Sequence, residues 1–143
     1  MTWLYNELPF TRELAQEKID EGYIGFVYEI TDSSNGKKYI GKKLLSSTRK
    51  LPPLKGKTRK RKKCVQSDWE KYYGSSETVK ALVESRQSDF IRRIVYLCKS
   101  KGELSYMEAK EQFDREVLLT DDFYNEFIGV KIHSNHVKSL WKK

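Results

Sequence analysis

Two tyrosines that could take part in proton transfer lie on either side of a tight turn. Residues 25–41 read GFVYEITDSSNGKKYIG, with Tyr28 and Tyr39 in apolar runs that flank Asn35-Gly36. Asn-Gly is a strong signal for a β-hairpin, because both turn positions need a positive φ. Such a hairpin brings the two phenols close together. A cation beside a phenol lowers its pKa, which lets the hydroxyl act as a base.

The same segment resembles the opening of the GIY-YIG nuclease family. Phe26-Val27-Tyr28 stands where the family has Gly-Ile-Tyr, with Gly25 one residue early, and Tyr39-Ile40-Gly41 matches the second motif. The resemblance extends over about residues 24–128. It implies a metal-dependent endonuclease, similar to small phage or homing-type enzymes, that hydrolyses phosphodiester bonds of DNA.

The resemblance implies catalytic roles for residues at both ends of the domain. Tyr28 corresponds to the tyrosine that acts as base, and Tyr39 would orient the water or the phosphate. At Gly41, a bulky side chain would block the close approach of the backbone. Asn125, in the pair Tyr124-Asn125, corresponds to an asparagine that supports the site. The alternative is structural: both tyrosines fill a half-buried face of the sheet, and the asparagine lies in a turn.

The family's metal ligand is a glutamate on the helix after the third strand, which would hold Mg²⁺ or Mn²⁺. Glu108 and Glu111 both fit this position. Glu108 also has the spacing of a capping box with Ser105, and Glu111 could form an ion pair with Arg115 at i+4. The hydrophobic-Glu-Ala pattern favours Glu108, and Glu111 stays open.

The resemblance also implies a phosphate-directed arginine and a second group for proton transfer. Arg49 has about the right spacing for the arginine, although two following prolines argue against a long helix there. Lys42 and Lys43 could supply point charges in its place. Tyr72 or Tyr73 could take part in proton transfer, although a cluster of aromatic residues is more often core.

The positive charge is concentrated in one segment. The chain has a net charge of +8, yet residues 33–67 contain 13 Lys or Arg and no Asp or Glu. Such a segment attracts polyanions, and the alternative is a solvated loop without a partner. We therefore predict an inserted basic loop over about 42–67. Its predicted nucleic-acid-binding residues are Lys42, Lys55, Lys57, Arg59, Lys60, Arg61, Lys62 and Lys63.

The pattern of elements predicts one α+β domain over residues 1–143. Its core would be a small three-stranded, mainly antiparallel sheet flanked by helices. The expected elements are a helix from Thr11 to Gly22, strands over about 24–31, 37–41 and 90–98, a helix capped at Ser75-Ser76, a helix that starts at Leu104-Ser105, and an irregular segment or edge strand over 123–132.

Composition excludes several other classes of protein. With 38% hydrophobic residues the chain is no disordered tail, and it has no apolar run long enough to cross a membrane. The beginning lacks a secretion signal, and Cys64 and Cys98 form no disulfide framework or zinc motif, so we expect a cytoplasmic protein. Two alternatives to the nuclease stay open: a non-catalytic nucleic-acid-binding module that has lost its activity, and a basic RNA- or ribosome-associated protein. The sequence carries no signal for the oligomeric state.

Overall fold

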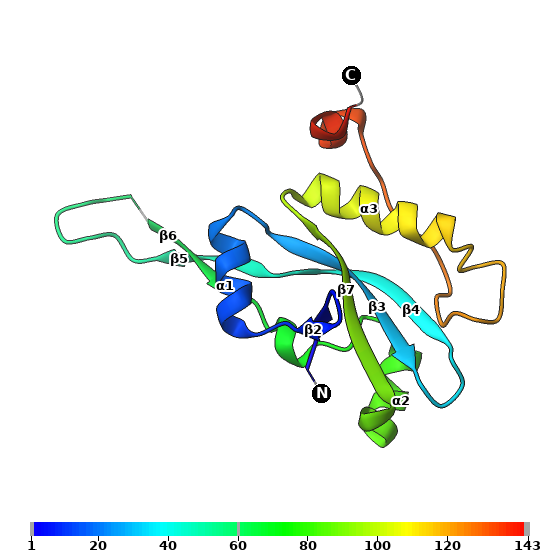
Figure 1. Cartoon of the computed structure of the whole chain (residues 1–143). Coiled ribbons are helices and arrows are strands. Elements are labelled where there is room, and N and C mark those ends of the chain that lie inside the picture. The colour runs from blue at the N-terminus through cyan, green and yellow to red at the C-terminus, as the bar shows by residue number, and fades with distance from the viewer. Residues whose placement is uncertain (1, 60, 142–143) are drawn as a thin grey trace.

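The central sheet is built on the predicted hairpin (Figure 1). The computed structural model describes residues 2–59 and 61–141. Strands β3 (Gly25–Asp32) and β4 (Lys38–Leu44) pair antiparallel. Strand β7 (Phe90–Cys98) pairs antiparallel with the other side of β3. These three strands are the ones that the sequence predicts.

Two short strands enlarge the sheet beyond the prediction. Strand β1 (Leu4–Tyr5) pairs parallel with β7, and β2 (Leu8–Pro9) pairs antiparallel with β1. The order is β2-β1-β7-β3-β4, so the predicted three-stranded, mainly antiparallel sheet is corrected to a five-stranded mixed sheet. A strand of two residues is too short to show the apolar alternation by which strands are recognised.

Helices cover both faces of the sheet. One face packs against α1 (Arg12–Asp20), α2 (Glu77–Arg86) and the 3-10 turn η1 (Trp69–Lys71). The other face packs against α3 (Lys101–Asp114). Two further 3-10 segments are η2 (Gln87–Asp89), before β7, and η3 (Ser134–Leu140), near the end of the chain.

The alternation of side chains along β3 divides the core into two clusters. Phe26, Tyr28 and Ile30 are fully buried in the cluster under α1 and α2. Val27 points to the opposite side and packs with Leu104 of α3. Both faces of β3 are therefore covered, which explains the uninterrupted apolar run from Phe26 to Tyr28.

The helix boundaries agree with the sequence at α1 and differ at α3. Thr11 caps α1 by accepting a hydrogen bond from the backbone of Leu14 at 3.1 Å, and Gly22 follows the helix with a φ of +101°. These two predictions are confirmed. Helix α3 begins earlier than predicted, with Ser100 as its cap. Glu108 is therefore in the helix interior, and its capping-box interpretation is wrong.

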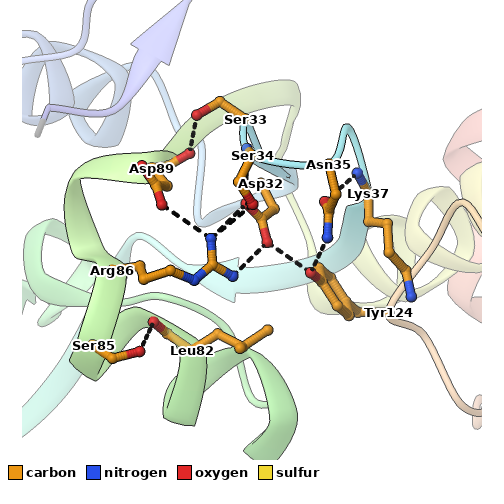
Figure 2. Close-up of polar contacts among 10 residues, drawn as sticks. All are labelled: Asp32, Ser33, Ser34, Asn35, Lys37, Leu82, Ser85, Arg86, Asp89 and Tyr124. Atoms are coloured by element: carbon orange, nitrogen blue, oxygen red, sulfur yellow. Dashed lines mark hydrogen bonds and ion pairs between the residues drawn. The ribbon is translucent and has the colours of Figure 1, made fainter.

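Asp32 organises the turn between β3 and β4 (Figure 2). Its carboxylate accepts hydrogen bonds from Ser34, from both terminal nitrogens of Arg86 at 3.1 and 2.8 Å, and from the Tyr124 hydroxyl at 2.7 Å. Gly36 alone in this turn has a positive φ, so the expectation that Asn35 shares it is wrong. The network joins the hairpin turn to α2 and to the segment that carries Asn125.

The predicted basic loop is largely a β-ribbon. Residues 42–44 belong to β4, and strands β5 (Ser46–Leu51) and β6 (Arg61–Gln66) form a separate antiparallel pair. The ribbon projects from the body of the domain, beyond α1 (Figure 1). The loop interpretation is corrected for these strands and holds for the connection between them.

Within the described part of the chain, none of the helices combines the length and the apolar character that a membrane span requires.

Candidate active site

An open cavity of about 400 Å³ lies at the exposed edge of β4, where the two faces of the sheet meet. Tyr39 reaches it from the α2 side of the sheet, and Glu108 reaches it from α3 on the other side. The start of α2 and the segment after Tyr124 close its remaining walls. The complete lining is Tyr39, Lys42, Ser75, Ser76, Glu77, Thr78, Glu108, Gln112, Tyr124, Asn125, Glu126, Phe127 and Gly129.

Glu108 supplies a carboxylate to this cavity. Its side chain is partly buried, and burial raises the pKa of Glu108 although the ammonium and the backbone N–H of Lys42 favour the charged form. The Lys42 ammonium donates a hydrogen bond to the Ser105 hydroxyl at 2.8 Å, which holds it against α3. A buried carboxylate beside an exposed cation is suited to bind a further cation or a proton.

Tyr39 supplies a hydroxyl to the same cavity. It is half-buried, and its hydroxyl forms a hydrogen bond with the Ser75 hydroxyl at 3.2 Å. Burial raises the pKa of Tyr39, and the neighbouring Tyr72 and Glu108 raise it further. The hydrogen bond with Ser75 lowers the pKa but does not cancel these effects. The phenol therefore keeps its proton at neutral pH and can donate a hydrogen bond into the cavity.

Tyr28 lies beneath the cavity and does not line it. Its side chain is fully buried, and a Cβ at Gly41 would lie 2.6 Å from its ring carbon Cζ. The Tyr72 ring is 5.8 Å away, yet within the described residues the Tyr28 hydroxyl makes no hydrogen bond of ordinary geometry. Burial, and then the neighbouring Tyr72 and Tyr39, raise the pKa of Tyr28 well above its usual value. This environment is unfavourable for a general base.

Two amides hold the strand that carries Tyr39. Asn125 accepts a hydrogen bond from the backbone N–H of Ile40 at 3.0 Å and donates one to the carbonyl of Ile40 at 2.8 Å. Gln112 donates a second hydrogen bond to that carbonyl at 3.0 Å. These contacts use the backbone groups of β4 at the edge of the sheet, so Asn125 and Gln112 fix the position of Tyr39 and Gly41.

Glu111 is turned away from the cavity. It accepts a hydrogen bond from Arg115 at 2.6 Å, and Arg115 also pairs with Glu29 of β3 at 2.5 Å. The i+4 ion pair considered from the sequence is thus present. The structure brings Glu108, rather than Glu111, together with Tyr39.

Three other predicted site residues lie outside the cavity. Lys43 pairs with Asp68 at 2.5 Å and lies over the Tyr72 ring. Tyr73 is buried under the guanidinium of Arg92, whose carbon Cζ is 4.0 Å from the ring centre. Arg49 is on β5 of the projecting ribbon, where no helix forms.

The predicted nucleic-acid-binding residues divide between the cavity and the ribbon. Lys42 is exposed at the cavity, whereas Lys63 is exposed on β6. Arg61 and Lys62 are also on β6. Lys55, Lys57 and Arg59 are exposed on the connection between the two strands, and Lys60 is outside the described residues.

Two cavity residues that bind Tyr39 or its strand, Gln112 and Ser75, were not among the predicted site residues. Gln112 is one helical turn after Glu108 on α3, a spacing that places both side chains on one face of the helix. Ser75 was considered only as a helix cap, but Ser76 is the cap of α2. No local sequence signal connects Ser75 with Tyr39. Among the residues of the described ranges, no group of three or more His, Cys, Asp or Glu is placed to hold a metal ion.

Comparison with known proteins identifies the family of the chain. A family model described as "Putative endonuclease segE, GIY-YIG domain" matches residues 3–128. Comparisons with curated proteins and with solved structures found no match. The matched region contains the whole sheet, all three α-helices and every residue that lines the cavity except Gly129. The chain therefore belongs to the GIY-YIG family of endonuclease domains.

Proposed function

We propose that this chain is a Mg²⁺-dependent endonuclease that hydrolyses phosphodiester bonds of DNA at the cavity beside β4. The observation that supports the proposal most strongly is the meeting of Glu108 and Tyr39, which come from opposite faces of the sheet, in one open cavity. Lys42 at the same cavity adds positive charge that favours a phosphate. The dipole of α2, which begins at this wall, acts in the same direction.

The cavity residues fit a single hard cation. Mg²⁺ is commonly bound by one or two carboxylates together with waters and substrate phosphates. Glu108 is the carboxylate that would hold it. Burial raises the pKa of Glu108 more than Lys42 lowers it, so a bound cation would add stabilisation to its charged form. When bound, the cation would act as a Lewis acid on a phosphoryl oxygen.

The other residues of the chain orient the reacting groups. The protonated hydroxyl of Tyr39, held by Ser75, donates a hydrogen bond to a phosphate oxygen or to the attacking water. The Lys42 ammonium counters the charge of the phosphate. Asn125 and Gln112 keep Tyr39 in register by binding Ile40. Tyr28 acts from below as a positioning residue, because its ring supports the backbone at Gly41.

The test is cleavage of a supercoiled plasmid by the purified chain with Mg²⁺ and with excess chelator. The proposal expects relaxed or linear plasmid only where Mg²⁺ is present. If the chain binds duplex DNA and leaves it uncut with Mg²⁺ or Mn²⁺, it is a binding module without catalysis and the proposal is wrong. If it does not bind duplex DNA, the DNA substrate is wrong as well.

A further inference from the structure

Two of the six facing pairs in the β5–β6 ribbon join basic residues. Its register sets Arg49 opposite Lys63 and Lys50 opposite Lys62. Like charges directly opposite each other destabilise an antiparallel pair. Between residues 33 and 67 the chain has no acidic residue that could compensate them. A bound polyanion would remove this repulsion.

The ion pairs of the described residues leave the ribbon's lysines to solvent. Those pairs involve the helices and the central sheet, and none of them reaches Lys50, Lys55, Lys57 or Lys63. All four side chains are exposed. A two-stranded ribbon without a third strand is marginally stable by itself, so the repulsion is important for this element.

The base of the ribbon is fixed to the domain. Ser67 donates hydrogen bonds to the carbonyls of Leu44 and Leu45 at 2.6 and 2.9 Å, and Gln66 donates one to the carbonyl of Arg12 at 2.9 Å. The buried Leu45 is the single residue between β4 and β5. The strand that carries Tyr39 and Lys42 thus continues directly into the ribbon (Figure 1). Because Tyr39 and Lys42 line the cavity, the ribbon projects from a fixed point relative to it.

We propose that the β5–β6 ribbon lies in the major groove of the DNA duplex and holds it through the phosphates on both walls. A major groove is about 12 Å wide and admits a two-stranded ribbon, whereas a minor groove of about 6 Å does not. Six residues in each strand make the ribbon roughly 20 Å long, which is sufficient to follow the groove. This inference rests on the proposed function, because it assumes that the substrate is duplex DNA.

The first test measures the contribution of charge. Lys55, Lys57 and Lys63 are replaced together by serine, and binding to a short DNA duplex is measured over a range of salt concentrations without divalent ions. Counterion release predicts that the slope of log K against log[salt] becomes shallower by about 2 to 3. The matched control replaces three exposed lysines of the body: Lys71, Lys101 and Lys131. A change of slope that is equal in both triple variants would overturn the proposal.

The second test uses the cysteine of the ribbon to separate groove insertion from phosphate contact alone. Cys64 on β6 is exposed and Cys98 is fully buried, so an uncharged maleimide modifies Cys64 selectively in the folded chain. The experiment compares duplex DNA with duplex RNA of the same length and charge. The major groove of RNA is too narrow and deep for protein side chains to read. We expect DNA to slow the modification of Cys64 about tenfold and RNA to slow it much less.

The outcomes of these tests are distinct from those of the cleavage test. Equal protection by DNA and RNA, or no protection by DNA at a concentration that saturates binding, would overturn insertion into the groove. Protection of Cys64 by DNA in a chain that never cuts plasmid would support the ribbon as a DNA-binding arm and reject the proposed hydrolysis. Cleavage of plasmid without protection of Cys64 would support the proposed hydrolysis and overturn the insertion of the ribbon into the groove.

Discussion

The two tyrosines of the hairpin have different environments although their motifs are alike. Tyr39 lies at the edge of the sheet, where one side of its ring faces the cavity. Tyr28 lies on the inner strand β3, between β7 and β4, and is fully buried among Trp3, Tyr72 and Gly41. The structure therefore favours Tyr39 as the tyrosine whose hydroxyl contacts the substrate, whereas the resemblance alone favours Tyr28 as the base.

Replacing each tyrosine with phenylalanine separates these roles. Tyr39→Phe removes the hydroxyl that faces the cavity, so we expect cleavage to fall about 100-fold while the fold is kept. Tyr28→Phe removes a buried hydroxyl and keeps the ring that supports Gly41. We expect it to cleave DNA at nearly the wild-type rate, with a melting temperature that is equal or higher. Single-turnover cleavage rates give the answer, and a large loss in folded Tyr28→Phe alone would restore the base role of Tyr28.

Gly41 is required by packing rather than by backbone conformation. A methyl group at this position would overlap the ring of Tyr28, and its φ is not positive. We expect Gly41→Ala to lower the free energy of unfolding by about 1–3 kcal/mol, the usual cost of overpacking. Denaturant unfolding measures this loss. Gly129→Ala is the matched control, because its Cβ would meet only the Phe127 ring at 3.4 Å, and an equal loss there would refute the packing argument.

At the scale of elements, Asp32 connects the hairpin turn to the cavity wall (Figure 2). The Asp32 side chain is inaccessible to solvent. The hydrogen bonds from Arg86 lower the pKa of its carboxylate below the usual range. A lowered folded-state pKa stabilises the protein above the unfolded-state value of about 3.9. This stability is lost as the pH falls through the folded-state pKa.

Asp32→Asn tests the connection by its pH dependence. We expect the variant to be less stable than the wild type by about 2 kcal/mol at pH 7, because Arg86 and Tyr124 lose a charged partner. The difference should shrink as the pH falls below about 4, because the unfolded chain then binds a proton at Asp32 that the folded chain, with its lowered pKa, does not. Urea unfolding at several pH values measures it. The exposed Asp121→Asn is the control, and a difference that is constant with pH would contradict the network.

The sequence predicted the elements that local signals define. Asn35-Gly36 between two apolar runs gave the hairpin, and Thr11 with Gly22 gave the limits of α1. The ribbon was not foreseen, because strands rich in Lys and Arg lack apolar alternation and their pairing is set by residues distant in the chain. The edge strands β1 and β2 were missed because each has two residues.

The candidate site was predictable only in part, because the positions of several side chains depend on residues distant in the chain. Motifs placed Tyr39, Asn125 and Glu108 in the set of site residues, and the structure brings all three to one cavity. Burial of Tyr28 depends on how η1 and α2 pack over β3, which the local sequence does not encode. The ion pair of Arg115 that turns Glu111 away involves Glu29 of a distant strand.

At the scale of the whole molecule, the basic ribbon and the candidate active site occupy separate regions that β4 connects. The segment 33–67 carries a charge of +13, and the remaining residues carry 15 basic and 20 acidic groups, or −5. The acidic balance of the body disfavours contact with DNA outside the cavity and the ribbon. Under the proposed function, the ribbon supplies affinity for DNA and the cavity beside β4 supplies cleavage.

The central claim is that Glu108, together with Tyr39, forms the catalytic cavity. The most direct measurement is plasmid cleavage with Mg²⁺ by the wild type, Glu108→Gln and Glu111→Gln at equal DNA occupancy. Glu108→Gln should lose cleavage by about 100-fold or more while it still binds DNA and melts normally. Glu111→Gln should keep its cleavage rate. It should be less stable by about 1 kcal/mol, because it loses the partly buried ion pair with Arg115. Full cleavage by folded Glu108→Gln, or loss of cleavage in Glu111→Gln alone, would contradict the account.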